Sequence, residues 1–398
     1  MTEIVSRPGR SPANPDRRSD RGRLSAFVSS KLASKLWQGV LWQGAAVVVI
    51  GVLAVWLWHN AKVNMEARHI TFGFDFLGHR AGFDIPFHLI EWDQDDTYGY
   101  ALLVCILNSA LCAAMSVVLA SALGLLIALM RLSGNPLAAG TARGVMEVAR
   151  NTPQLVQIFF IYIAVLQSLP SPRLSYYFGA GIFLNVRGLL LPAPDIDPLV
   201  QLIGVLVLGV ALIGWFARRP GHLGGVILGP VLVLAWLVGA GLSARWELPA
   251  LHGFNFTGGV RVPPELLALW LGISIYTAAF ISEIVRAAIL GIPHGQTEAA
   301  LTLGLSRGQA MYLVVLPQAL RVLIPPLTSQ YLNIIKSTTL GAAIAYPDIL
   351  QIFGRTVLNQ SGRAVEVMTL LIGVFLSVNL TTSVLMNRWN HRLMSQGR

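Results

Sequence analysis

The sequence predicts an all-α protein that crosses a membrane several times. Hydrophobic residues make up 54% of its 398 residues and charged residues only 12%, whereas charged residues make up roughly 25% of soluble domains. Several apolar runs reach the ~18–20 residues that a helix needs to cross the hydrocarbon core of a bilayer. Together these observations indicate a polytopic transmembrane helical bundle.

The apolar runs predict about eight spans. They are Leu41–His59, Tyr98–Met130, Pro153–Leu169, Leu199–Ala217, Gly224–Leu242, Leu266–Val285, Leu313–Ile335 and Val367–Met386. The two cysteines, Cys105 and Cys112, both fall in the second run, where we expect them to pack in the core.

The chain before the first span is a basic tail. Residues 1–36 hold eight Lys or Arg and three Asp or Glu, which is typical of a disordered cytoplasmic tail and not of a cleaved signal peptide. Its charge favours attraction to anionic lipid, and we expect no nucleic acid partner. Residues 37–97 comprise the first span and an acidic outer loop, in which the repeated GFDF and GFDI predict a short hairpin.

Charge sets the orientation. With the N-terminus inside, the inner pieces hold 18 Lys or Arg and the outer pieces hold 10, which is the excess that the positive-inside rule expects. Both termini, including the tail 391–398, are therefore predicted to lie in the cytoplasm.

A stretch with a different composition divides the rest of the chain. Residues 171–259 are rich in Pro and Gly, and we interpret them as an insertion with two spans, which leaves the orientation of later spans unchanged. Residues 98–170 and 260–390 then form the two parts of the main bundle.

Residues 293–312 are predicted to form a cytoplasmic loop between two spans. Residues 297–303 are mostly good helix formers, and Gly304 follows where a left-handed cap is needed. Ser306 and Gln309 have the spacing of a capping box that opens the next helix. The loop therefore reads as two short helices joined at a corner.

No catalytic or metal-binding residues are expected. The chain has no glycine-rich phosphate loop and no paired histidines at metal-ligand spacing. The letters GLSRG at Gly304–Gly308 match a nucleophile elbow, but a helix precedes them where that motif needs a strand. We therefore expect no cofactor on this chain.

The loop resembles that of a known family. Glu298, Ala299, Ala300, then Gly304, Val314, Leu316 and Pro317 reproduce the spacing E-A-A-x3-G-x9-I-x-L-P, with Val in place of Ile. This pattern resembles the cytoplasmic coupling loop of ABC importer permeases.

Flanking stretches resemble one branch of that family, the polar amino-acid uptake permeases. They are Met146–Tyr162, Tyr276–Gly291, Leu316–Leu327 and Asn333–Leu340. The resemblance covers about Tyr98–Leu169 and Leu266–Met386 and implies a core of five spans. The extra first span and the insertion resemble the larger subunits of the general L-amino-acid transporters.

The resemblance implies a pore-forming subunit of a type I importer in the bacterial inner membrane. Its partners would be two ATPase subunits that use ATP, a second and non-identical permease subunit, and a periplasmic amino-acid-binding protein. The residues that match the loop motif, Glu298 to Pro317, would then contact the ATPases. A carboxylate at Glu298 would lie near a helix N-terminus, where the helix dipole favours it.

Five residues in or near the spans are candidates for the substrate path: Glu283, Lys336, Asn333, Pro325 and Pro326. Glu283 has Arg286 and Arg321 as alternative partners. The prolines predict a broken helix, of the kind that lines substrate paths, with an ordinary kink as the alternative.

Two other functions stay open. An ion-coupled secondary transporter needs no ATPase, although intramembrane carboxylates, on which proton relays depend, are scarce here. A membrane scaffold without transport activity is the second alternative.

Overall fold

A computed structural model describes residues 41–60, 62–64, 73–197, 200, 203, 204, 206, 207, 223–253 and 255–395. The basic tail 1–36, the last three residues and most of the fourth predicted span lie outside this part of the chain. The chain divides into two units, Met1–Phe72 and Gly73–Arg398. In the first unit, the helix Leu41–Asn64 is apolar and exposed along its length.

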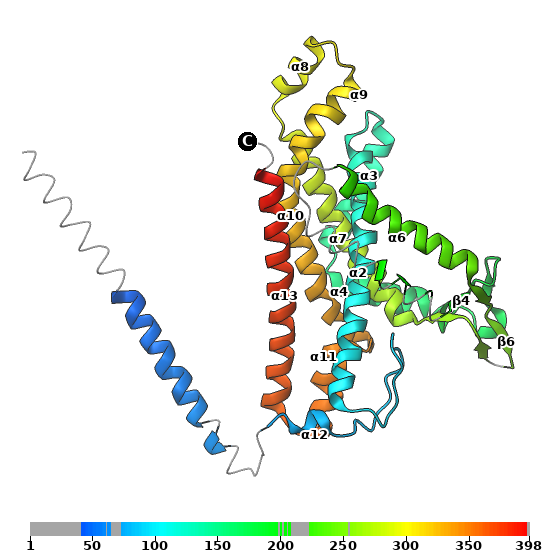
Figure 1. Cartoon of the computed structure of the whole chain (residues 1–398), viewed down its shortest axis with the longest axis vertical. Helices are drawn as coiled ribbons and strands as arrows, with labels where there is room; N and C mark the ends of the chain where they lie inside the picture. Colours follow the sequence, from blue (N-terminus) through cyan, green and yellow to red (C-terminus); the bar gives the residue numbers. More distant parts are fainter. Residues whose placement is uncertain are drawn as a thin grey trace, which may run out of the picture. The chain divides into compact units, whose positions relative to one another are not determined.

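Long helices form the body of the second unit (Figure 1). They are α2 (Tyr98–Leu132), α7 (Pro264–Leu290), α10 (Leu316–Ser337) and α13 (Ala364–Ser395). The most extensive contact is between α2 and α7. Small residues permit it, since a Cβ on Gly124 of α2 would lie only 2.6 Å from the side chain of Ile281 on α7.

Five helices of the described residues are long and apolar enough to cross a membrane: Leu41–Asn64, Tyr98–Leu132, Pro264–Leu290, Arg307–Ile344 and Ala364–Arg388. The predicted count of eight is not confirmed. The third and fifth predicted spans coincide with shorter apolar helices, Gln154–Leu166 and Val231–Gly241. The first of these consists of α4 (Gln154–Phe159) and the π-helical segment η2 (Phe160–Leu166), and α3 (Pro136–Asn151) precedes it.

The helix α10 continues through Pro325 and Pro326, so the prediction that the prolines break this span is wrong. The two prolines supply no N–H donors, and Thr328 bonds to the backbone beside them, its hydroxyl donating to the Ile324 carbonyl at 3.0 Å. The irregular geometry lies instead at the two ends of α10. A π-helical segment, η4 (Met311–Val315), precedes it, and a 3₁₀ segment, η5 (Thr338–Ile344), follows it.

The two ends of the bundle differ (Figure 1). At one end, α8 (His294–Thr302) and α9 (Arg307–Ala310) project beyond the long helices; we call this the α8 end. At the other, the α12 end, lie η1 (Asp75–Gly78), α11 (Ile349–Gln351), η6 (Ile352–Val357) and α12 (Leu358–Ser361). The predicted hairpin is wrong, because η1 and irregular backbone replace it; the pairing there is a single bridge, Arg80 with Thr97.

The helix α2 reaches both ends because it has 35 residues, or about 52 Å at 1.5 Å per residue. The first turns of α2 pack at the α12 end of the bundle. There Ala101, Val104 and Cys105 join a second core with Phe76 and Phe353.

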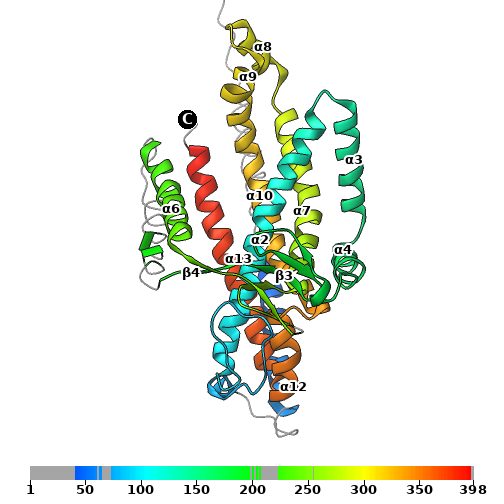
Figure 2. The same cartoon turned by 90° about the vertical axis from the view of Figure 1, so that its right-hand side faces the viewer.

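The insertion contains short strands beside one helix (Figure 2). After a 3₁₀ turn, η3 (Pro172–Leu174), the strands are β1 (Tyr176–Tyr177), β2 (Phe183–Asn185), β3 (Gly188–Leu191), β4 (Ala193–Asp195), β5 (Arg245–Glu247), β6 (Ala250–His252), β7 (Asn255–Thr257) and β8 (Val260–Val262). They form antiparallel sheets in the orders β1-β2-β3-β8, β4-β5 and β6-β7. The helix α6 (Leu223–Ser243) covers the fifth predicted span.

Candidate functional site

The predicted corner at the α8 end is present. Gly304 has a φ of +85°, in the left-handed region that glycine adopts without strain. Ser306 and Gln309 form the predicted capping box: the Gln309 backbone N–H donates to the Ser306 hydroxyl at 3.3 Å, and the Ser306 backbone N–H donates to the Gln309 side chain at 2.9 Å. The chain therefore turns sharply between α8 and α9.

The corner exposes both polar and apolar side chains. Glu298 and Ala299 on α8 are exposed, whereas Ala300 is 3% exposed and packs inward. Leu303, just past the end of α8, is 83% exposed. Sequence reasoning missed Leu303.

A hydrogen bond ties α8 to the span that follows it. The Gln318 amide on α10 donates to the Gln296 side chain at 3.2 Å and to the Val314 carbonyl at 3.0 Å. Leu316 is half-buried and Pro317 exposed at the start of α10. The hydrogen bond between Gln318 and Gln296 joins α8 to the start of α10.

Glu283 sits between two arginines. Its carboxylate lies 2.5 Å from the Arg131 guanidinium at the end of α2 and 3.0 Å from that of Arg286 one turn along α7. Arg286 was one of its two predicted partners, whereas Arg321 is not in contact with it. The ion pair locks α2 to α7, so Glu283 has a structural partner that the sequence pattern did not reveal.

A cavity of about 450 Å³ lies between α4, α7, α10 and η5. Asn333 and Lys336 on α10 line it, opposite Tyr276 and Thr277 on α7. Glu283, Pro325 and Pro326 are not among its lining residues. The structure thus brings two of the five candidate path residues together and separates them from the other three.

A polar contact closes one side of this cavity. The Ser337 hydroxyl donates to the Gln154 side-chain oxygen at 3.1 Å, which connects α10 to α4. Sequence reasoning did not select these two residues. The signal was available, because both lie in the stretches Met146–Tyr162 and Asn333–Leu340 that carry the family resemblance.

A buried polar group stands at the α12 end. Asp348 is fully buried, and its carboxylate caps α11 by accepting the Gln351 N–H at 2.7 Å. Burial raises the pKa of the Asp348 carboxyl to about 7. Nearby, the Tyr346 hydroxyl donates to the Asn108 carbonyl at 2.9 Å, and the Asn108 amide donates to the carbonyls of Phe87 and Pro347.

A second group of contacts joins residues 73–75 to the start of α13 and to Arg363 just before it. Arg363 donates to Asp75 and to the Gly73 carbonyl, both at 2.5 Å, and Glu366 accepts from the Gly73 N–H at 2.9 Å. The hydrogen bond from Arg363 holds the pKa of the exposed Asp75 carboxyl below its usual value. These contacts and the second core hold residues 73–97 against the bundle.

The chain is similar in sequence to proteins of one transport family. Residues 120–396 match the family model described as the inner membrane component of binding-protein-dependent transport systems. The chain is 46% identical over 388 residues to YhdX of Escherichia coli (strain K12), a protein assigned by name to the amino-acid ABC transporter permeases; the match covers 94% of this chain and 97% of YhdX.

Two further relatives match over most of their length. The general L-amino acid transport system permease protein AapQ of Rhizobium johnstonii is 40% identical, with 90% of this chain and 92% of AapQ covered. The glutamate/glutamine/aspartate/asparagine transport system permease protein BztB of Rhodobacter capsulatus is 35% identical, with 88% of this chain and 93% of BztB covered.

Proposed function

Because this chain belongs to the family of inner membrane components of binding-protein-dependent transport systems, we propose that it is the multi-pass permease subunit of an ATP-binding cassette importer for L-amino acids. The names of its relatives, at 35–46% identity over most of the chain, support the substrate class. The observation that carries the proposal within the structure is the exposed corner from Glu298 to Leu303, built by Gly304 and the Ser306 capping box at the projecting end of the bundle.

The corner is the proposed docking site for the ATPases. Glu298 offers an exposed carboxylate that suits an arginine of a partner, and the exposed Leu303 suits an apolar socket. Glu298 and Ala299 then face the ATPase, whereas the inward-facing Ala300 fixes the helix on its own bundle. Leu316 and Pro317 begin the span that the docked corner moves.

The proposed partners are two ATPase subunits, a second and non-identical permease, and a periplasmic binding protein. We place the α8 end and both termini in the cytoplasm and the α12 end outside, in the bacterial inner membrane. The excess of Lys and Arg on the α8 side supports this orientation.

Transport follows from the linkage between the corner and the cavity. When ATP closes the two ATPases, the pull on α8 passes through Gln296 and Gln318 to α10, and the spans rock between inward- and outward-facing states. The cavity lined by Asn333 and Lys336 lies on α10, so its opening changes with that movement. It is the proposed substrate path, in which Lys336 offers a cation to the substrate carboxylate.

Reconstitution of the full complex in proteoliposomes tests the proposal. We expect uptake of L-amino acids only with binding protein outside and ATP inside, unaffected by ionophores. Uptake that persists without ATP and collapses with ionophores would show a secondary transporter. A complex that assembles but neither transports nor hydrolyses ATP in response to binding protein would show a scaffold.

A charge reversal tests the docking site itself. Glu298→Arg is expected to abolish uptake and to release the ATPases on purification. Glu147→Arg, which reverses an exposed carboxylate on α3 away from the corner, is the matched control and should leave both unchanged. Normal uptake and assembly of the Glu298→Arg complex would refute the proposed docking site for the ATPases.

A further inference from the structure

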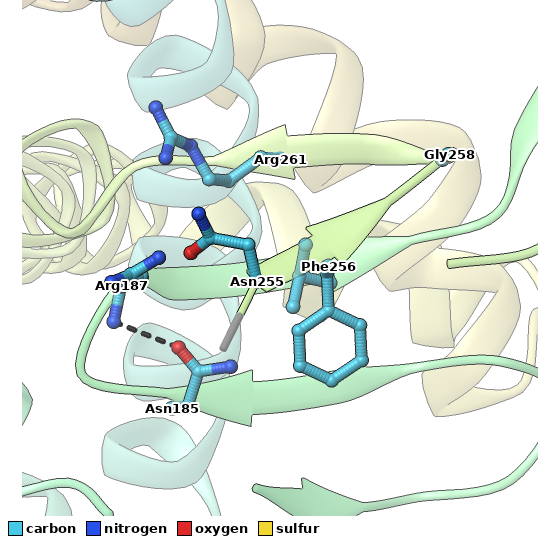
Figure 3. A pocket seen from close by; sticks show the side chains of 8 residues that line it. Asn185, Arg187, Asn255, Phe256, Gly258 and Arg261 are labelled. Atoms are coloured by element: carbon cyan, nitrogen blue, oxygen red, sulfur yellow. Dashed lines mark hydrogen bonds between the residues drawn. The ribbon is translucent and has the colours of Figure 1, made fainter. Parts of the chain in front are cut away.

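Two arginines line one pocket at the insertion sheet (Figure 3). Arg187 and Arg261 line a pocket of about 340 Å³ together with Asn185, Asn255 and Phe256. The same two arginines line an adjoining pocket of about 450 Å³, which also holds Glu265, Gln167 and Phe87. Both pockets are separate from the cavity that contains Lys336.

The local sequence fixes the position of Arg187. It is the second residue of a two-residue turn between β2 and β3. Gly188 follows with a φ of +110°, and a Cβ there would lie 2.1 Å from the Val262 carbonyl oxygen. Asn185, fully buried, accepts the Arg187 backbone N–H at 2.8 Å and donates to the Ser175 hydroxyl at 2.9 Å. The close approach of Gly188 to β8 and the hydrogen bonds of Asn185 therefore fix the turn that carries Arg187.

Strand pairing places Arg261 beside this turn. It lies in β8, opposite Leu190 of β3, and the phenyl ring of Phe256 packs on Phe183 of β2 at 4.8 Å between ring centroids. In the view of Figure 3, Asn255 lies between Arg187 and Arg261, and all three line the pocket. The sheet thus presents two cations to one opening.

Neither guanidinium has a hydrogen-bond or ion-pair partner among the described residues; the contact of Arg187 with Asn185 is made by its backbone N–H. Two like charges on one pocket repel each other, and a carboxylate between them relieves that repulsion and accepts charge-assisted, bidentate hydrogen bonds. The first pocket contains no acidic side chain among its lining residues. It is complementary to an anion.

The adjoining pocket carries the opposite charge as well. Glu265, at the start of α7, accepts the Tyr162 hydroxyl at 3.0 Å through one of its oxygens, and its side chain lines the same space as both arginines. A ligand in this pocket therefore meets two cations and a carboxylate. Both signs of charge are what a zwitterion needs.

We propose that the Arg187, Arg261 and Glu265 pocket is a receiving site for a free L-amino acid, with the α-carboxylate between the two arginines and the α-ammonium on Glu265. The inference rests on the proposed function. Phe87 and Pro347, which line the pocket, belong to segments at the α12 end, so the site faces the proposed outer side. Its volume suits a ligand of this size. The amino acid occupies it before it enters the cavity on α10.

Direct binding tests the site. The full complex in nanodiscs, without binding protein, is titrated with radiolabelled L-glutamine, one of the amino acids named for a relative. Unlabelled L-glutamine should displace the label, and L-glutaminamide, whose carboxylate is replaced by a neutral amide, should not. Arg187→Gln with Arg261→Gln should weaken binding roughly 10- to 100-fold. Arg245→Gln, an exposed arginine of β5 outside both pockets, is the matched control and should bind as wild type.

A second measurement distinguishes a free amino acid from a carboxylate of the docked binding protein. ATP hydrolysis is measured against binding-protein concentration, and the half-saturating concentration should be the same for wild type and the double variant. A raised half-saturating concentration with unchanged L-glutamine binding would overturn the proposal and identify a docking contact. Absence of carboxylate-dependent binding in wild type would also overturn it. If the wild-type complex transports with ATP, the proposed function stands in either case.

Discussion

Glu283 on α7 and Arg131 at the end of α2 form an ion pair at 2.5 Å, between residues 152 positions apart in the chain. The Arg131 side chain is 10% exposed, so water does little to solvate its charge. Glu283 is its carboxylate partner, and Arg286 shares that partner from a more exposed position, 33%.

Glu283→Gln should destabilise the chain by about 1–3 kcal/mol, because it leaves the Arg131 guanidinium, 10% exposed, without its charged hydrogen-bond partner. Arg286→Gln should cost less. The thermal midpoint of the purified chain measures both, with Glu298→Gln at an exposed site as the control. A wild-type midpoint for Glu283→Gln with a raised KM for uptake would show instead that Glu283 contacts substrate.

Gly304→Ala should uncouple transport from ATP hydrolysis. A Cβ at Gly304 meets nothing within 4 Å, so the effect comes from the φ of +85°, which costs a non-glycine residue about 1 kcal/mol and favours another turn. Uptake per ATP hydrolysed is the measurement. Gly308→Ala, equally free of contacts but inside α9, is the control and should transport normally; equal losses in both variants would contradict the prediction.

Lys336→Met should lower uptake by roughly 10- to 100-fold, because a charge-assisted contact to a substrate carboxylate contributes about 1.5–3 kcal/mol. ATP hydrolysis stimulated by the binding protein should persist, since Lys336 lies far along α10 from the corner. Lys336→Arg keeps the charge and should retain most of the uptake. If Lys336→Met also stops ATP hydrolysis, the residue serves the conformational change and not the substrate.

Asp348→Asn should change how stability depends on pH. The raised pKa, about 7 against an ordinary 3.8, means that between about pH 4 and 7 the folded chain holds a proton that the unfolded chain has released. Stability therefore falls as pH rises through this window, by at most ~1.4 kcal/mol per pH unit. The Asp348→Asn side chain still has an oxygen that accepts the Gln351 N–H. Because an amide does not titrate, this variant should lose the fall of stability with rising pH.

Thermal midpoints between pH 5 and 8 measure this slope. Asp75→Asn is the control, since its lowered pKa gives stability that is present above pH 4 and lost as pH falls below it. It should therefore leave the slope between pH 5 and 8 intact. A wild-type slope in the Asp348→Asn variant would contradict the assignment.

Local signals account for what the sequence predicted well. Gly304 and the Ser306–Gln309 pair determine the corner within a few residues, so their pattern was sufficient. The strands of the insertion were missed because each has only two to four residues, too short for an alternating pattern to emerge from a region rich in Pro and Gly. The contact between Glu283 and Arg131 depends on the packing of α2 against α7, which no local pattern encodes.

The prolines of α10 show the limit of a local rule. Proline disrupts a helix because it lacks the N–H of the i→i−4 hydrogen bond and its ring clashes with the i−4 carbonyl. In this bundle α10 nevertheless continues through both prolines, which membrane helices packed among neighbours tolerate. The irregular turns instead flank α10, where it meets the corner and the cavity.

The pairing of β3 with β8 has a consequence for how the chain is assembled. Leu191 and Val260 are direct partners across this ladder, so their Cα atoms are only about 5 Å apart. The segment between them therefore begins and ends at neighbouring positions of the same sheet. Such a junction lets a long segment be added or exchanged without altering the route of the chain on either side.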